Sequence, residues 1–405
     1  MSCLYGKLSR MPNLENNNIQ FVFSSYDPAE NYELIEQIWT SLLKKCQHSY
    51  FMSWGWISTW IRNLPSTSKV EFVVGYQNEA PTLAFFLGYK TRYKFGLLPS
   101  KIVSLNTVGE PYYDLLYIEY NSVLCENCNE QLINAFVEYI NKLKWDEFVL
   151  PGITNDFLAG INISKQFRDS KFHAFPDETT SSFYVELQKI RDADMDFLKL
   201  LSANKRSQVR RSIKQYELEG KIQVEEAETL EQALFMFQGL VAFHQEEWNK
   251  RGEPGVFSNQ YVYQFHLDLI RSRFAHKEIQ LLQIRNDKMT IGFLYCFVYQ
   301  NEVLFYQCGF CYTEGNVFRP GLVSHYYAIK HNAQKDMKTY DFLAGSESYK
   351  SSLSTNSVPI YWVRLMKNGI RLLLKKEFRN LKSNIKSIRF AQGNKESSAE
   401  AAHLQ

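Results

Sequence analysis

The segment YDFLAGSESYKSSL, residues 340–353, combines the pattern of a buried strand with a cluster of ionisable side chains. Its apolar residues indicate a strand that ends near a glycine at position 345. Four groups that exchange protons or hold charge lie within or directly after this strand: Asp341, Glu347, Tyr349 and Lys350. Carboxylate, phenol and ammonium groups gathered at one strand end are typical of general acid–base chemistry, so these residues form the candidate catalytic set.

The composition predicts a globular protein with two domains of ordinary size. The chain has 405 residues, of which 45% are hydrophobic and 22% charged, and this length exceeds that of a usual single core. A net charge of +3 is too small to indicate nucleic-acid binding, and no DNA partner is expected. The sequence has neither a signal-peptide core nor roughly 18 successive apolar residues, which predicts a soluble, cytoplasmic protein.

The seven cysteines show no regular framework, which fits a reducing compartment. Two CxxC pairs occur. A strand period of two places Cys308 and Cys311 on opposite faces, which disfavours a zinc site, and no metal is expected. Cys125 and Cys128 are interpreted as ordinary cysteines.

A weak internal repeat relates residues 70–99 to residues 278–310. Each block is predicted to form three antiparallel strands joined by polar turns, and each is followed by a helix and another strand. The repeat predicts an α/β fold of tandem units, each a mixed, mostly antiparallel sheet flanked by helices.

The boundary between the two units is placed after residue 185. The predicted organisation is a flexible amino terminus at 1–18, a structural domain at 19–185, a catalytic domain at 186–365, a basic amphipathic helix at 366–391 and a disordered tail at 392–405. The basic helix is consistent with peripheral contact with an anionic membrane surface, and also with a terminal helix packed on its own domain. Nothing in the sequence indicates the oligomeric state.

Three segments together resemble the CelD/BcsL-type acetyltransferases. These form a branch of the GNAT acyl-CoA N-acyltransferase superfamily and are related to the FemABX aminoacyl ligases. The segments are FMSWGWISTWIRNL, FHQEEWNKRGEPGVF, and FRPGLVSHYY together with YDFLAGSESYK. The resemblance implies two GNAT-like units in tandem, in which a central strand of the second unit separates from its neighbour to admit the pantetheine arm of an acyl-CoA.

The resemblance also implies where acyl-CoA, most simply acetyl-CoA, would bind. A helix amino terminus beside the gap favours the pyrophosphate through free N–H groups and the helix dipole. The matching positions on the strand and the helix are Gln307, Cys308, Gly309, Phe310, Arg319, Pro320, Gly321 and Leu322. The usual phosphate loop of the superfamily is absent, and a plain loop between strand and helix remains the alternative.

Acyl transfer to an amine needs a proton acceptor, a stabilised oxyanion and a proton for the departing thiolate. By this resemblance, Asp341 or Glu347 would collect the amine proton, and backbone N–H groups of residues 307–310 or Lys350 would stabilise the oxyanion. Tyr349 matches the tyrosine that reprotonates the thiolate. The alternative for Asp341 is a buried acid that only pairs with a neighbour or caps a turn.

Residues for the acceptor come from two helical segments. His244 and Trp248 are four residues apart and therefore share a helical face, with Arg251 nearby to contact an anionic group. Arg210 and Arg211 belong to a basic helix at residues 202–215 that could contact the acceptor or CoA phosphates. The alternatives are a core or cleft-wall pair for the first set and a solvated face for the second.

The most direct hypothesis is therefore an enzyme, an N-acyltransferase that moves an acyl group from acyl-CoA to an amine on a small molecule. A sugar or a cell-envelope or polysaccharide (glycan) precursor is a plausible acceptor. One alternative is a FemABX-like aminoacyl transferase that uses charged tRNA. Another is a non-catalytic protein on a degenerate acyltransferase fold, since the first unit has no counterpart of Glu347, Tyr349 and Lys350.

Overall fold

The structure is a computed structural model that describes residues 21–94, 98–126, 128–163, 172–313, 318–345 and 348–367. The predicted flexible segment 1–18, the tail 392–405 and all but the first two residues of the basic helix 366–391 lie outside these ranges, as does Glu347. No helix within the described ranges is long and apolar enough to cross a membrane.

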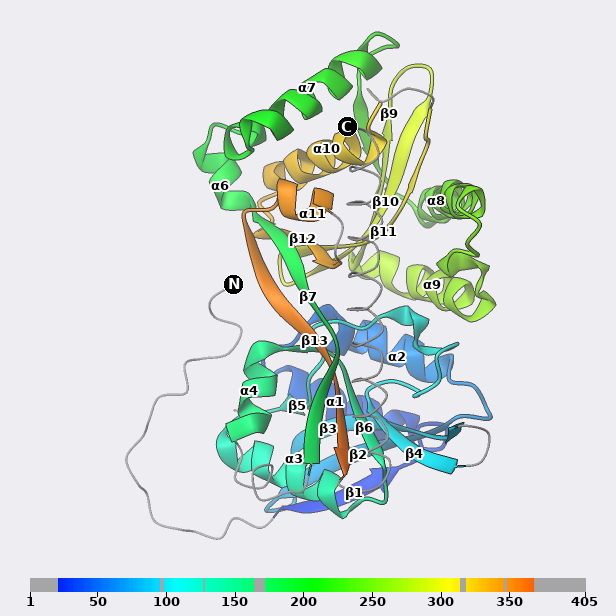
Figure 1. The fold of residues 1–405 in the computed structure, drawn as a ribbon, viewed down its shortest axis with the longest axis vertical. Helices are drawn as coiled ribbons and strands as arrows, with labels where there is room; N and C mark the ends of the chain where they lie inside the picture. Colours follow the sequence, from blue (N-terminus) through cyan, green and yellow to red (C-terminus); the bar gives the residue numbers. More distant parts are fainter. Residues whose placement is uncertain are drawn as a thin grey trace, which may run out of the picture.

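The described strands form one mixed, 13-stranded sheet with helices on both faces (Figure 1). The order along the sheet is β1-β2-β3-β4-β6-β13-β7-β12-β11-β10-β9-β8, with β5 paired to β3. The strands are β1 (Val22–Tyr26), β2 (Lys69–Gln77), β3 (Ala80–Lys94), β4 (Leu98–Leu105), β5 (Leu124–Cys125), β6 (Glu147–Thr154), β7 (Phe172–Glu186), β8 (Gln223–Glu226), β9 (Ile279–Arg285), β10 (Thr290–Tyr299), β11 (Glu302–Phe310), β12 (Thr339–Ala344) and β13 (Asn356–Lys367).

The α-helices lie between these strands in chain order. They are α1 (Tyr32–Leu43), α2 (Trp54–Arg62), α3 (Glu130–Lys142), α4 (Asn155–Ile163), α6 (Leu187–Asp192), α7 (Ala203–Glu217), α8 (Leu230–Lys250), α9 (Gln260–Arg273), α10 (Pro320–Gln334) and α11 (Ser348–Leu353). In the second half of the chain, α6, α7 and α10 cover one face of the sheet, and α8 and α9 cover the other (Figure 1). We call these the α10 face and the α8 face.

Both predicted three-strand blocks are present, β2-β3-β4 and β9-β10-β11. In the first block Asn78 and Glu79, with φ of 49° and 62°, form the tight turn between β2 and β3. Gln300 and Asn301, with φ of 50° and 63°, do the same between β10 and β11. Two successive residues in the left-handed region match the right-handed twist of the flanking strands, which explains why these hairpins form locally.

Each half also contains one short parallel pair of strands. In the first half β4 pairs with β6 after the helix α3, and in the second half β11 pairs with β12 after the helix α10. A parallel neighbour requires such a helical crossover. The repeated arrangement confirms the predicted fold class, tandem α/β units with mixed, mostly antiparallel sheets flanked by helices.

Two long strands, β7 and β13, connect the halves into a single sheet. β13 pairs with β6 on one side and with β7 on the other, and β7 also pairs with β12. Figure 1 shows both strands running between the upper and lower parts of the molecule. Because β7 of the first half pairs with β12 and β13 of the second, and β13 pairs with β6 and β7 of the first, the limits 19–185 and 186–365 remain a prediction about independent domains.

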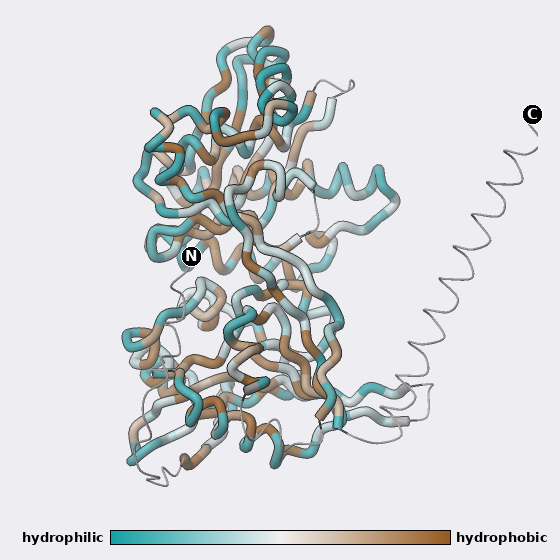
Figure 2. Tube along the Cα trace, turned by 60° about the vertical axis from the view of Figure 1, so that its left-hand side comes forward, coloured by the Kyte–Doolittle hydropathy of each residue, from teal (hydrophilic) through white to brown (hydrophobic). Residues whose placement is uncertain are grey.

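An aromatic core joins the halves on the α8 face. Trp56 of α2 lies 4.8 Å from the ring of Phe265 in α9 and 5.7 Å from that of Phe297 in β10. Tyr50 stacks on Phe297 at 4.4 Å. Figure 2 shows hydrophobic segments running through the centre of both halves. Each fully buried ring of this size contributes about 1.5–3 kcal/mol, so this contact ties the first half firmly to the second.

Cys125 and Cys128 form a disulfide, which corrects their interpretation as ordinary cysteines. The chain turns between the end of β5 and the start of α3, and this turn brings the two Cα atoms to 5.4 Å. That separation is within the range a disulfide requires. The odd number of cysteines gave no indication of this pair, because the pairing depends on the turn before α3.

Candidate functional site

The strands β11 and β12 separate after only three paired residues. Their parallel ladder runs from Glu302 opposite Thr339 to Leu304 opposite Asp341 and ends there. Beyond that point β11 continues to residue 310 and β12 continues to residue 344. We call the resulting gap the split. It lies at the place where the sequence predicted an opening.

A bulge in each strand produces the split. In β11 the pairing with β10 passes over Tyr306, since Phe305 and Gln307 have successive partners. In β12 the pairing with β7 shifts between Asp341 and Ala344. Leu343 there has a φ of 57°, in the left-handed region that non-glycine residues rarely adopt. Bulges bend and twist a strand, so the two neighbours diverge from this point.

The predicted cofactor-binding strand presents backbone groups to the split. The Cys311 N–H donates to the Ile291 carbonyl of β10. Hydrogen-bonding direction alternates along a strand, so the N–H groups of Cys308 and Phe310 face the opposite side, toward the split. Gly309 packs tightly against α8, because a Cβ there would lie 2.2 Å from the Leu240 carbonyl oxygen.

The amino terminus of α10 also borders the split. Pro320 begins the helix, and a Cβ on Gly321 would lie 3.2 Å from the ring of Phe310. Phe310 therefore packs against the first turn, next to buried Leu322. Nearby, the Arg319 side chain donates to the Gln208 side chain at 3.2 Å.

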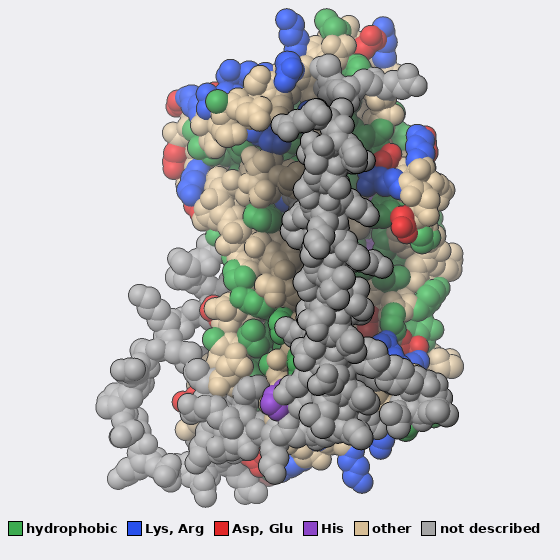
Figure 3. All heavy atoms as spheres, in the orientation of Figure 1, with side chains coloured by type: hydrophobic (Ala, Val, Ile, Leu, Met, Phe, Trp, Pro, Cys, Tyr) green, Lys and Arg blue, Asp and Glu red, His purple; other side chains and the backbone are tan. Residues whose placement is uncertain are grey.

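Lys205, which belongs to the same basic helix as the predicted Arg210 and Arg211, approaches this helix terminus. Burial, followed by the positive charge of Arg319, lowers the pKa of Lys205. Arg210 and Arg211 are exposed on the same helix, α7, and Figure 3 shows Lys and Arg side chains along that edge of the molecule. Two cations beside the start of α10 form a plausible place for a phosphate.

Asp341 is completely buried and accepts three hydrogen bonds. Tyr120 Oη donates to its Oδ2 at 2.5 Å, while Ser182 Oγ and the Leu343 N–H donate to Oδ1, each at 2.7 Å. Burial raises the pKa of Asp341, and these donors act to lower it. The arrangement fits the alternative of a paired buried acid, and the Leu343 bond also stabilises the unusual backbone at the bulge.

Glu119 is a second buried carboxyl group at the same strand end, and the sequence analysis did not identify it. Its side chain is 6% exposed, and its Oε2 accepts the Ala344 N–H at 2.7 Å. Burial raises the pKa of Glu119 to about 8; the Ala344 N–H lowers it, the charge of Asp341 raises it and that of Lys350 lowers it. A lone carboxylate in the apolar run LLYIEY was a signal available in the sequence.

Lys350 and Tyr349 lie on either side of this strand end. Lys350 is 7% exposed, and its Nζ donates to the Ala344 carbonyl oxygen at 2.7 Å. Tyr349 stacks on the His325 ring at 5.3 Å on the α10 face. Burial, followed by the Lys350 charge, lowers the pKa of His325 to about 3, so this imidazole is neutral.

His325 offers an unused hydrogen-bonding group next to the split. Its Nδ1 bonds to the Tyr340 hydroxyl at 3.0 Å. Its Nε2 is buried and has no hydrogen-bond partner among the described residues. Buried polar atoms are normally satisfied by protein, water or ligand, so a ligand group entering from the α10 face could bond there.

A segment of the first half, residues 116–120, reaches both separated strands from the α8 face. The Tyr306 hydroxyl of β11 donates to the Leu116 carbonyl oxygen at 2.8 Å. Glu119 and Tyr120 bond to β12, as described above. The first half therefore contacts both strands that border the split.

The predicted acceptor residues gather near the end of α8. The buried His244 ring lies 5.8 Å from Trp248 and 5.0 Å from Phe257, and burial lowers the pKa of His244. Arg251 forms an ion pair with Glu247 at 2.6 Å and lies over the Trp248 ring. Its charge is thus already matched within α8. These residues share the α8 face with segment 116–120.

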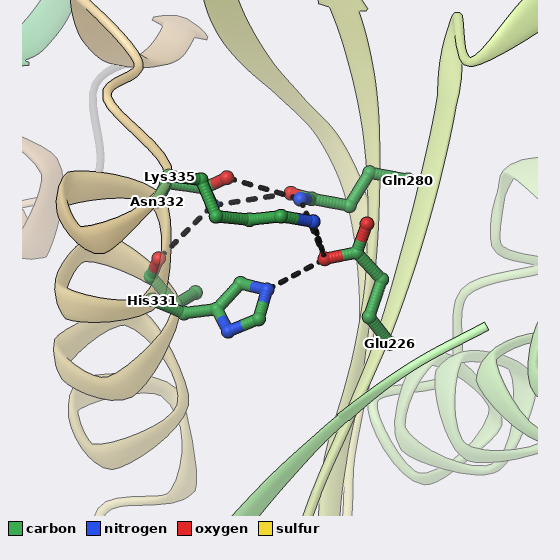
Figure 4. Close-up of polar contacts among 6 residues, drawn as sticks. Glu226, Gln280, His331, Asn332 and Lys335 are labelled. Carbon is green, nitrogen blue, oxygen red and sulfur yellow. Dashed lines mark hydrogen bonds and ion pairs between the residues drawn. The ribbon is translucent and has the colours of Figure 1, made fainter. Parts of the chain in front are cut away.

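A cavity of about 680 Å³ lies elsewhere, between β8, α8 and the far end of α10. Figure 4 shows Glu226 there, whose Oε2 accepts from His331 at 2.6 Å, Lys335 at 2.7 Å and Gln280 at 3.2 Å. Burial acts to raise the pKa of Glu226, but the bonds from His331 and Lys335 lower it overall. His331 is eleven residues beyond the start of α10, or roughly 17 Å along the helix.

Comparison with known protein families gives a match within the second half of the chain. Residues 203–351 match the family described as acetyltransferase (GNAT) domain. This match runs from α7 through the split to α11. A search of the curated proteins gives no significant match. The finer resemblance to CelD/BcsL-type enzymes remains a prediction.

Solved structures with the same fold cover most of the chain. The crystal structure of FemX is 11% identical, with a TM-score of 0.52, over 84% of this chain and 96% of that one. A conserved protein of unknown function from Bacteroides thetaiotaomicron is also 11% identical with a TM-score of 0.52, over 86% of this chain and all of that one. At such identity the likeness concerns the fold alone.

Proposed function

We propose that this chain is an N-acyltransferase that transfers an acyl group, most simply acetyl, from acyl-CoA to a primary amine. The main support is the split between β11 and β12 inside the segment that matches the GNAT domain. A gap between two parallel strands exposes backbone donors that an inserted thioester can use. The acceptor is proposed to be an amine on a small molecule, with a sugar or envelope precursor as the first class to examine.

The residues around the split are suited to hold acyl-CoA. The N–H groups of Cys308 and Phe310 would bond to the pantetheine or the acyl oxygen. Lys205 and Arg319 would face the pyrophosphate at the start of α10, and His325 Nε2 offers a further bond. Phe310 lies against Gly321 in this structure, so the proposal includes a small movement of that ring when acyl-CoA enters.

The chemistry then divides between the two faces of the sheet. On the α10 face, Tyr349 would return a proton to the departing thiolate. On the α8 face, the acceptor amine would approach past α8 and segment 116–120. Lys350, buried at the strand end, would favour negative charge developing on the acyl oxygen.

The test is calorimetric titration of the purified chain with acetyl-CoA. We expect saturable binding, and we expect Arg319→Ala to weaken it at least fivefold because it removes a phosphate contact. Lys142→Ala is the matched control, since it removes one positive charge from an exposed position on α3 in the first half. Absence of binding at millimolar acetyl-CoA would contradict the proposal.

The likeness to FemX supports a second candidate, aminoacyl transfer from charged tRNA, and the absent phosphate loop fits it too. This alternative requires tRNA binding that weakens steeply with salt, because each phosphate contact releases counterions. Titration with aminoacylated tRNA at two salt concentrations separates the candidates. Salt-insensitive or absent binding would remove this alternative.

A further inference from the structure

We infer that the first half supplies a catalytic residue, and that Glu119 takes the proton from the acceptor amine. This inference rests on the proposed N-acyl transfer. It assigns a reacting group to the half that the sequence analysis treated as structural. The site is then composite, with the acyl donor held by the second half and the proton acceptor supplied by the first.

The position of Glu119 is fixed by its bond to the strand end. Its Oε2 accepts the Ala344 N–H at 2.7 Å, three residues beyond the last pair of the β11–β12 ladder. The carboxyl group therefore lies just where the strands have separated. It is on the α8 face, which also carries His244 and Trp248, the residues proposed to contact the acceptor.

The two buried carboxyl groups have different environments, and this difference assigns their roles. Asp341 accepts three hydrogen bonds from Tyr120, Ser182 and Leu343, which hold it as a fixed acceptor. Glu119 accepts a single N–H, from Ala344; burial and the Asp341 charge disfavour its anion, and the Lys350 charge favours it. Burial raises the pKa of both carboxyl groups, and the group with three hydrogen-bond donors holds a negative charge more readily than the group with one.

The proposed step balances in atoms and charge. An alkylamine arrives as an ammonium ion, and the Glu119 carboxylate takes one N–H proton, which frees the lone pair. The nitrogen then forms a bond to the acyl carbon while the carbon–sulfur bond breaks and the thiolate leaves with its electron pair. The second nitrogen proton balances the thiolate, through Tyr349 or solvent, and Glu119 releases its proton to water.

The experiment compares the full chain with Glu119→Gln, which keeps an oxygen to accept the Ala344 N–H but cannot take up a proton. Glu226→Gln is the control, because that residue lies in the separate cavity of Figure 4. Acetyl-CoA binding is measured by calorimetry. Thiol release from acetyl-CoA is measured from pH 6 to 10 with glucosamine, lysine and hydroxylamine as probes. Hydroxylamine is uncharged at neutral pH and needs no prior deprotonation.

We expect Glu119→Gln to bind acetyl-CoA within twofold of wild type and to lose about 100-fold or more of thiol release with lysine at pH 7.5, where the lysine ε-amine is almost entirely an ammonium ion. The loss with hydroxylamine is expected to be less than about fivefold. The wild-type rate with the alkylamine should rise toward pH 8 as Glu119 ionises, whereas the rate of Glu119→Gln should rise only at the higher pH where the amine itself loses its proton in solution. Glu226→Gln should resemble wild type.

The outcomes separate the inference from the function on which it rests. The role of Glu119 would be overturned if Glu119→Gln lost thiol release equally with lysine and hydroxylamine, or lost none. It would also be overturned if the variant kept the pH profile of the wild type. Each of these results would leave acyl transfer intact. If wild-type protein neither binds acetyl-CoA nor releases thiol with any probe, the proposed function fails and the inference is overturned with it.

Discussion

At the scale of single residues, the carboxyl groups of Asp341 and Glu119 show how much local donors matter. Both are buried against the same strand end, where burial raises the pKa of each and the Lys350 charge acts to lower it. The number of hydrogen-bond donors differs, and this number determines which group can remain an anion without water. A residue type alone could not have indicated that difference.

Asp341→Asn should destabilise the protein by about 2–4 kcal/mol. The amide cannot accept from Tyr120, Ser182 and Leu343 as the carboxylate does, so buried donors lose their partners. Urea unfolding measures the change. Asp336→Asn is the control, because Asp336 is exposed at a left-handed position that asparagine tolerates. A change below 1 kcal/mol for Asp341→Asn would contradict the structural role.

The free energy of unfolding should respond to pH through Glu119. Its pKa is about 8 in the folded chain against 4.5 ordinarily, so the folded state binds more protons than the unfolded state between these values. Stability contributed by the protonated form is therefore lost as pH rises from about 4.5 to 8, by at most roughly 4–5 kcal/mol.

Glu119→Gln removes this titration. Its stability relative to wild type should increase from pH 5 to pH 9, as measured by urea unfolding at several pH values. A difference between the two proteins that stays constant with pH would show that Glu119 does not titrate in this range.

The candidate site was partly predictable at this scale. Asp341, Tyr349 and Lys350 are close in the sequence, and the end of a strand brings them together. Tyr120 and Glu119 lie more than 200 residues earlier, and only the assembled sheet places them there. Arg251 was predicted to contact an anionic group, and this stays a prediction; in the structure its side chain pairs with Glu247, four residues earlier.

At the scale of elements, the strand β11 depends on a close contact with α8. Gly309→Ala would bring a Cβ against the Leu240 carbonyl oxygen, which is backbone and cannot move aside cheaply. We expect a loss of about 2–4 kcal/mol, because β11 or α8 must shift. Thermal unfolding measures it.

Gly160→Ala is the matched control for this substitution. Gly160 lies in α4, and the nearest side-chain atom to a Cβ there would be 3.8 Å away. Alanine should leave stability unchanged or raise it slightly, because it favours the helix. If both alanine variants melted with wild type, the close contact of β11 with α8 would be disproved.

Hairpins were the elements that sequence reasoning predicted best. The alternation of apolar residues and the turn residues around Asn78 and Asn301 are local signals, and they fix strand and turn together. The bulges at Tyr306 and Leu343 were not foreseeable in this way, because they depend on what the neighbouring strand and the first half require. The split was expected only through a family resemblance.

At the scale of the whole molecule, β7 and β13 make the two halves depend on each other. The position of β13 between β6 and β7 could not be predicted from its sequence, because the apolar pattern of a strand does not specify which strands pair with it. We predict that residues 19–185 expressed alone will not form a stable monomer, because β6 and β7 would expose unpaired edges.

Size-exclusion chromatography and hydrogen exchange test this prediction. The expected result is aggregation or rapid exchange in β6, whereas in the complete chain the β6 amides exchange slowly. A soluble monomer with protected β6 amides would instead support residues 19–185 as an independent domain.

The place of β13 in the sheet has a consequence for synthesis on the ribosome. About 200 residues separate the end of β6 from the start of β13, and translation at 5–20 residues per second needs about 10–40 s to make them. Throughout that interval the edge of β6 that later pairs with β13 has no partner strand in the nascent first half. β13 must pair with that edge after it is synthesised. Until then we expect chaperones to bind the growing polypeptide.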